Sequence, residues 1–203
     1  MTGRLQVNDT MNPPEPTEAV DEALLITAAA SGSTPAFTQL FNRYYPMIHA
    51  FAFRLSLCPA EAGDIAQDTF IQAARALGGF RREASFKNWL YTIAANKSRD
   101  RHRQRTRRAR LSEAYATLND TTGGLAGGAS DDSAASVAVR EALGGLSTEL
   151  REAVALVYYE GLNHAEAARI LGCAETTVSW RLFRAKQKLK RVLRSPAAGG
   201  SHD

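Results

Sequence analysis

Residues 162–178 read LNHAEAARILGCAETTV, and this stretch decides the fold of the second half of the chain. Asn163 is a favourable helix N-cap, and Glu166 follows at the spacing of a capping box. Gly172 permits a tight turn between this helix and the next one. One apolar face runs through both helices and is formed by Ala167, Ile170, Leu171, Val178, Leu182, Ala185 and Leu189. The stretch therefore predicts a helix-turn-helix.

The second helix of this motif has a polar face on the side opposite Val178. Its N-terminal hydroxyls suit a phosphate because backbone N–H groups are free there, and Arg184 can reach guanine or phosphate. The exposed pair Trp180 and Phe183 also fits a protein-binding patch. The basic residues that follow favour DNA. The candidate duplex-binding residues are Thr176, Thr177, Ser179, Trp180, Phe183, Arg184 and Lys188.

Positive charge is concentrated in two segments, although the net charge of the 203-residue chain is only +4. Residues 97–110 hold eight Lys and Arg against one acid, and residues 181–194 hold seven with no acid. A single run of this kind is usually a solvated helix face. Two runs separated by a spacer favour two contacts with one polyanion.

A low-complexity stretch divides the chain. Residues 119–136 consist mostly of Gly, Ala, Ser, Thr and Asp, a composition typical of a flexible tether. No alternating Val, Ile or Thr pattern indicates a strand. We therefore predict an all-α protein with two small helical domains joined by a flexible linker, the second a four-helix, winged-helix-like helix-turn-helix domain. The predicted ranges are a disordered lead (1–19), an N-terminal domain (20–110), the linker (111–136), a C-terminal domain (137–195) and a tail (196–203).

Helix signals organise the N-terminal domain. Thr34 and Pro35 predict a helix start, and Pro46 is expected to kink or interrupt that helix. A second helix is expected over residues 59–77, and Ser85 is the predicted cap of a third. The third helix loses its apolar stripe where the basic run begins, so its second half is expected to leave the core. That stripe is formed by Phe86, Trp89, Leu90, Ile93 and Ala94.

Composition disfavours several function classes. No run approaches the ~18 apolar residues of a membrane span, and residues 1–16 lack the apolar segment of a secretion signal. Cys58 and Cys173 stand alone, and no His/Cys group has the spacing of metal ligands. We expect a cytoplasmic protein with no metal, no cofactor, no membrane partner and no small-molecule substrate.

Glu61, Asp64 and Asp68 lie on one face of the helix expected over residues 59–77. Carboxylates four residues apart can hold a divalent metal, as a nuclease requires. No carboxylate or histidine from elsewhere in the chain, and no lysine in reach, is evident to complete such a site, so no catalytic residue is assigned and an enzyme is not expected. A docking face for a basic protein and a solvated face are the remaining alternatives.

Three motifs, taken together, resemble those of a known family. Residues 64–70 (DIAQDTF) resemble D-x-x-Q-E-x-F, and residues 80–96 (FRREASFKNWLYTIAAN) resemble F-R-G-x-x-S-F-x-x-W-L-Y-x-I-A-x-N. Residues 177–185 (TVSWRLFRA) are similar to T-V-x-S-R-L-x-R-A. These are motifs of the extracytoplasmic-function (ECF) sigma factors of bacterial RNA polymerase, and the resemblance covers roughly residues 20–193.

The resemblance implies a sigma factor that binds core RNA polymerase, directs it to promoter DNA and helps to open the duplex, with an anti-sigma factor as a further expected partner. It implies core-polymerase binding by Asp64, Gln67, Asp68 and Phe70. It implies binding of the −10 element by Phe80, Arg81, Ser85, Asn96, Arg99 and Arg103, with Phe80 stacking on a flipped base. The duplex-binding residues of the helix-turn-helix would recognise the −35 element. A stand-alone helix-turn-helix transcriptional regulator is the alternative.

Four residues depart from the family pattern. Asp68 replaces Glu and keeps the charge with a shorter reach, and Ser147 stands where Pro commonly follows Leu. Arg82 stands where Gly is common, so the −10 loop is expected to take another shape. Trp180 replaces Ser, and its indole can contact a thymine methyl and donate one hydrogen bond, so we expect an altered −35 preference.

Overall fold

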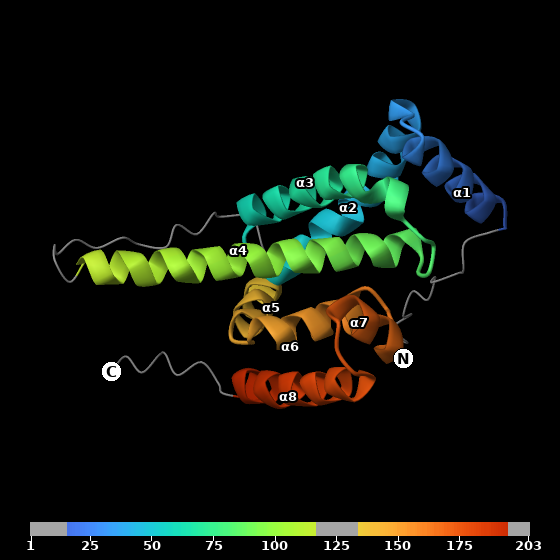
Figure 1. Ribbon diagram of the computed structural model, residues 1–203. Helices are drawn as coiled ribbons and strands as arrows, with labels where there is room; N and C mark the ends of the chain where they lie inside the picture. Colours follow the sequence, from blue (N-terminus) through green and yellow to red (C-terminus); the bar gives the residue numbers. More distant parts are fainter. Residues whose placement is uncertain (1–15, 117–133, 195–203) are drawn as a thin grey trace, which may run out of the picture.

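The computed structural model describes residues 16–116 and 134–194, and these ranges are helical without any strand (Figure 1). The first range contains α1 (Pro16–Ala30), α2 (Thr34–Ser56), α3 (Pro59–Ala76) and α4 (Phe86–Ala116). The second contains α5 (Ala134–Gly144), α6 (Thr148–Val154), α7 (His164–Leu171) and α8 (Glu175–Arg194). The prediction of an all-α protein with a helical N-terminal domain and a four-helix C-terminal domain is confirmed.

Local signals position the first helices, with two differences from the sequence-based expectation. The N-cap of α2 is Ser33, whose side chain accepts a hydrogen bond from the Ala36 N–H, and not Thr34. α2 also continues through Pro46 without interruption. The helix tolerates this proline because packing of its apolar face against α3 and α4 offsets the lost backbone hydrogen bond.

Two boundaries differ from the predicted domain ranges. α1 begins at Pro16, inside the range predicted as a disordered lead. α4 continues past residue 110 to Ala116, and α5 begins at Ala134, so both helices extend into the predicted linker. The rest of the predicted linker, residues 117–133, lies outside the described residues, as do most of the lead and the tail.

The helix-turn-helix forms as its sequence predicts. The Asn163 side chain accepts from the Glu166 N–H, and the Glu166 carboxylate accepts from the Asn163 N–H, which completes the capping box. Gly172 has a φ of 64°, a left-handed conformation that ends α7 and redirects the chain into α8. A π-helical turn, Ala155–Tyr159, extends α6 toward the start of this motif.

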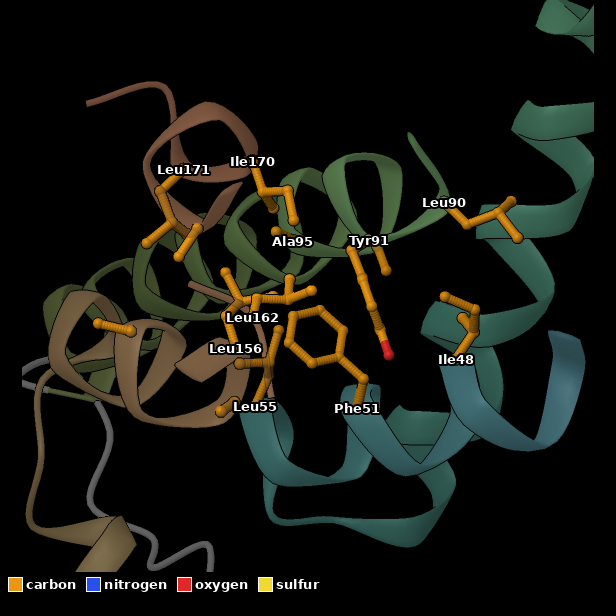
Figure 2. Close-up of a cluster of buried hydrophobic side chains, with 14 of the residues drawn as sticks. Ile48, Phe51, Leu55, Leu90, Tyr91, Ala95, Leu156, Leu162, Ile170 and Leu171 are labelled. Atoms are coloured by element: carbon orange, nitrogen blue, oxygen red, sulfur yellow. The ribbon is translucent and has the colours of Figure 1, made fainter. Parts of the chain in front are cut away.

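The two domains share one hydrophobic core (Figure 2). Phe51 and Leu55 from α2 and Tyr91 from α4 lie beside Leu156 and Leu162 of the C-terminal domain. The Phe51 and Tyr91 rings meet edge-on, with centroids 4.9 Å apart. Because apolar burial is the main stabilising contribution to association, this shared core holds the C-terminal domain against α2 and α4.

Candidate nucleic-acid and protein interfaces

The helix α8 separates a buried face from an open one. Val178 and Ala185 are fully buried, whereas Trp180 is 58% exposed and Phe183 is 59% exposed. The guanidinium of Arg184 lies 5.7 Å from the centre of the Trp180 ring, within the range of a cation–π contact. The predicted duplex-binding residues Thr176, Ser179, Trp180, Phe183, Arg184 and Lys188 are exposed, and Thr177 is half-buried. The structure therefore brings them together on one accessible face.

One further residue contacts this face and was not predicted from the sequence. Ser179 Oγ lies 2.9 Å from Nδ1 of His164, at the start of α7, and 3.3 Å from the backbone oxygen of Glu175. His164 thus fixes the position of a candidate DNA-binding hydroxyl. The alignment of α7 against α8 brings the two together, and the sequence carries no separate signal for this contact.

The loop between α3 and α4 holds the candidate −10 residues. Phe80 is half-buried, with its ring centre 4.9 Å from that of Trp89 and 5.7 Å from that of Phe86. Trp89, predicted on the apolar stripe, is also only half-buried. Ser85 caps α4 by accepting from the Asn88 N–H at 3.2 Å. Arg81 and Ser85 are exposed.

Arg82, which stands where Gly is common, has a backbone conformation that glycine adopts more readily than other residues. Its φ is 57°, in the left-handed region that an L side chain rarely adopts. The guanidinium donates to Thr27 Oγ1 at 2.6 Å and to the backbone oxygen of Ala23 at 3.2 Å. These hydrogen bonds to α1 offset the backbone strain and tie the loop to the N-terminal helix.

A cavity of about 310 Å³ lies between this loop and the C-terminal domain. Phe80, Arg81 and Trp89 line one side, and Glu166 and Arg169 of α7 line the other. An aromatic wall beside arginines is suited to a nucleic-acid base, which can stack on a ring while its phosphate meets a cation. In this arrangement α7 closes one side of the cavity.

Arg99 on α4, another candidate −10 residue, is already bound within the chain. It donates to the two carboxylate oxygens of Glu152 on α6 at 2.7 and 2.8 Å, and to Asn96 Oδ1 at 3.3 Å. Glu152 is fully buried. Burial raises the pKa of Glu152, and the hydrogen bonds from Arg99 oppose that effect. The same hydrogen bonds raise the pKa of Arg99.

Further polar contacts join the two domains around this pair. Glu160 accepts from the Tyr91 hydroxyl and pairs with Arg54 at 2.8 Å. Burial, together with the hydrogen bond to Glu160, raises the pKa of Tyr91, so its hydroxyl remains the donor. Arg151 of α6 donates to the backbone oxygen of Leu55 at 2.7 Å. Carboxylates of the C-terminal domain thus face cations and hydroxyls of the N-terminal domain.

The predicted polymerase-docking face on α3 is accessible, but its acids are paired. Arg101 of α4 binds Asp64 at 2.9 Å and Asp68 at 2.7 Å. Gln67 is exposed, whereas Phe70 is only 4% exposed and packs against Phe41. Asp64, Gln67 and the edge of Phe70 line one shallow groove between α2 and α3. A partner in this groove would meet Asp64 at its rim.

The described ranges contain neither a cluster of metal-ligand residues nor a helix suited to span a membrane. No group of three or more His, Cys, Asp or Glu residues within residues 16–116 and 134–194 is arranged to hold a metal ion. None of the helices in these ranges combines the length and apolar character of a membrane span. The acids of α3 that raised the possibility of a metal site instead pair with arginines of α4.

Family models match both domains. The model of Sigma-70 region 2 matches residues 40–108, and that of Sigma-70 region 4 matches residues 136–189. The ECF RNA polymerase sigma factor SigM of Mycobacterium tuberculosis is 34% identical over 174 residues, which cover 85% of this chain and 84% of SigM. The chain belongs to the ECF sigma factors. It is therefore a promoter-recognising sigma factor of RNA polymerase.

Other relatives agree with this assignment. The RNA polymerase sigma factor CnrH of Cupriavidus metallidurans is 35% identical over 182 residues, covering 85% of this chain and 94% of CnrH. The solved structure of CnrH with the cytosolic domain of CnrY matches with a TM-score of 0.63 and 32% identity, over 87% of this chain and 99% of CnrH. The sigma factor RpoE from Bartonella quintana, solved with the anti-sigma factor NepR, matches with a TM-score of 0.64 and 30% identity, over 78% of this chain and 97% of RpoE.

Proposed function

We propose that this sigma factor recognises the −35 duplex through the exposed face of α8 and the −10 element through the loop at Phe80 and the basic half of α4. The single observation that supports this division best is the open α8 face, where an aromatic pair and Arg184 project from a well-packed helix-turn-helix. A helix presented in this way fits the major groove. The chain supplies binding surfaces and no catalytic group.

Phe80 and Trp89 support a role for the loop in opening the duplex. Melting costs stacking energy, and a ring that stacks on an exposed base recovers part of it. Phe80 is anchored on Trp89 and Phe86, so its ring is held at the cavity before DNA arrives. We assign Phe80 to a flipped base and Asn96, which is exposed, to a hydrogen bond nearby.

Binding of the −10 strand by this site requires the two domains to separate. The Glu152 carboxylate is hydrogen-bonded to the guanidinium of Arg99, and α7 closes one side of the Phe80 cavity. A phosphate can replace the Glu152 carboxylate only when the C-terminal domain moves away from α4. We infer that docking on core polymerase through Asp64, Gln67 and Asp68 accompanies this separation.

A restraining partner is the remaining part of the proposal. Two relatives of similar fold were solved with a bound protein: RpoE with NepR, described as an anti-sigma factor, and CnrH with the cytosolic domain of CnrY. We propose that this chain is likewise held by an anti-sigma protein that favours the closed arrangement.

The direct test combines a pull-down with core RNA polymerase and run-off transcription from a promoter selected with the resulting holoenzyme. The proposal expects a stable complex and a transcript with a defined start. Binding to duplex DNA without any polymerase complex would instead indicate a stand-alone regulator and would refute the assignment of α3 as a docking face.

A further inference from the structure

The hydroxyl of Ser179 lies on the face of α8 proposed to bind the −35 duplex, and it has two partners within the chain. Its oxygen lies 2.9 Å from Nδ1 of His164, at the start of α7, and 3.3 Å from the backbone oxygen of Glu175, one turn earlier in α8. Ser179 is exposed, and His164 is half-buried. One side of the hydroxyl thus faces the chain, and the other side is open to a bound duplex.

These two contacts decide where the single hydroxyl proton of Ser179 points. A carbonyl oxygen can only accept, whereas a histidine ring nitrogen accepts or donates according to its protonation. When Nδ1 carries no proton, the hydroxyl donates to it, because two lone pairs facing each other across 2.9 Å repel. When Nδ1 carries a proton, it donates to Ser179 Oγ, and the hydroxyl proton turns to the backbone oxygen of Glu175. In every protonation state of His164 the hydroxyl proton is therefore directed into the chain.

The side of Ser179 that faces solvent consequently carries a lone pair. A serine oxygen has one O–H group and two acceptor lone pairs, so at least one lone pair remains free in either arrangement. In the major groove its hydrogen-bonding partners are the base amino groups, N6 of adenine and N4 of cytosine. The N7, O6 and O4 atoms of the bases, and the phosphate oxygens, are themselves acceptors and cannot pair with it.

We propose that Ser179 recognises a base amino group of the −35 duplex as a hydrogen-bond acceptor, and that His164 is the positioning residue that fixes this polarity. The inference rests on the proposed function, because it uses α8 as the helix that binds the −35 duplex. Trp180, the next residue, has the opposite polarity, since its indole N–H can only donate. Two neighbouring side chains of α8 thus offer the duplex one acceptor and one donor.

The test uses the holoenzyme of the full chain with core RNA polymerase and compares wild type with Ser179→Ala, His164→Ala and His164→Asn. Selection from promoters with a randomised −35 duplex first finds the base pair at which wild type and Ser179→Ala differ in preference. At that pair one analogue removes the amino group from the major groove, 2-aminopurine for adenine or pyrimidin-2-one for cytosine. A second analogue, a 7-deazapurine, removes the N7 acceptor and leaves the amino group in place. Ser179→Ala is the control for any effect of an analogue on the duplex itself.

Removal of the amino group should weaken wild-type binding about threefold to tenfold more than it weakens Ser179→Ala, which is the usual contribution of one neutral hydrogen bond. Removal of N7 should affect the two proteins alike. His164→Ala should respond less to loss of the amino group, because only the longer contact to Glu175 then competes for the hydroxyl proton. His164→Asn, whose side-chain amide again places a polar atom beside Ser179, should restore the wild-type response.

Three results would overturn the proposal. A loss on removal of N7 in wild type but not in Ser179→Ala would show that the hydroxyl donates to the duplex. Identical base preferences of these two proteins would show that Ser179 recognises no base, and a wild-type response in His164→Ala would exclude His164 as the positioning residue. Ser179→Ala and the analogues test the acceptor role without requiring that His164→Ala folds. Failure of the wild-type holoenzyme to select any −35 sequence would instead refute the proposed function.

Discussion

The face of α8 proposed to bind the −35 element and the face of α4 proposed to bind the −10 element differ in what they contact within the chain. On α8, Trp180 and Phe183 are more than half exposed and the Arg184 guanidinium lies over the Trp180 ring. On α4, Arg99 is held by two hydrogen bonds to the buried Glu152, and the cavity beside Phe80 is closed on one side by α7. Both surfaces are proposed to bind the same promoter, yet one is free and the other is occupied by the chain itself.

The difference indicates where the cost of promoter binding arises. A solvent-exposed cation gives up only bound water when it binds a phosphate. Arg99 must first break its ion pair with a buried carboxylate, and Glu152 must then be hydrated. The −35 face makes no such exchange. We therefore propose that contact between the two domains weakens −10 binding without weakening −35 binding. Substitutions on each surface should affect the two kinds of DNA binding differently.

Charge reversal at the docking face should have the largest effect. Asp64→Lys/Asp68→Lys should weaken core-polymerase binding by more than about 100-fold, because like charges across an interface cost several kcal/mol. Binding of the full chain to a −35 duplex should be unchanged. Arg101→Gln is the control, since it frees both acids without altering them and should retain core binding. Equal core affinity for wild type and the double reversal would exclude this face as the docking site.

Removal of the Phe80 ring should have the second-largest effect. Phe80→Ala should reduce open-complex formation by about 1–3 kcal/mol, the usual contribution of one base stacked on an aromatic ring. Permanganate footprinting of duplex templates measures the loss, and a promoter with a pre-melted −10 segment should restore much of it. A variant that footprints like wild type would show that Phe80 serves only the packing around Trp89 and Phe86.

Loss of the buried carboxylate should release the covered surface. Glu152→Gln should raise the affinity of the free chain for a single-stranded −10 oligonucleotide about tenfold, because hydrogen bonds to charged groups contribute roughly 1.5 kcal/mol or more. Its affinity for a −35 duplex should not change. Glu149→Gln makes the same charge change on an exposed residue of α6 and should behave like wild type. Equal −10 affinity in all three proteins would contradict the role of Glu152.

The effect expected at Trp180 is the smallest. Trp180→Ser should shift the preference at one −35 position by about 1 kcal/mol, at the low end of the cost of a mismatched base pair. Trp180→Phe keeps an apolar ring for a thymine methyl and removes the N–H, so it separates the two possible contacts. Selection of −35 variants by each full chain measures the preference. Identical selected sequences would mean that Trp180 contacts only the DNA backbone or polymerase.

The helix-turn-helix was predictable because its signals are local. Asn163, Glu166 and Gly172 act within a few residues of one another, and the structure confirms the capping box and the left-handed turn. The exposure of Trp180 also follows from helical spacing within α8. The start of α1 at Pro16 and the full length of α4 were not predicted.

The contacts that cover the −10 surface could not be predicted, since they depend on how two domains meet. Glu152 lies beside Arg151 in a helix that also carries Glu149, so its sequence does not single it out, and its partner Arg99 lies 53 residues earlier in the chain. Arg101 resembled the other arginines of the basic run until the structure placed it against Asp64 and Asp68. A charge pattern in the sequence predicts the sign of the charge on a surface, but only the packed structure shows which charged groups are already paired.

The central claim is that the chain covers its own −10 surface while leaving its −35 surface open. The most direct measurement compares the free wild-type chain with the holoenzyme for binding to a −35 duplex and to a single-stranded −10 oligonucleotide, at one salt concentration. The free chain should bind the −35 duplex and fail to bind the −10 strand, and the holoenzyme should bind both. Equally tight −10 binding by the free chain and the holoenzyme would contradict the claim.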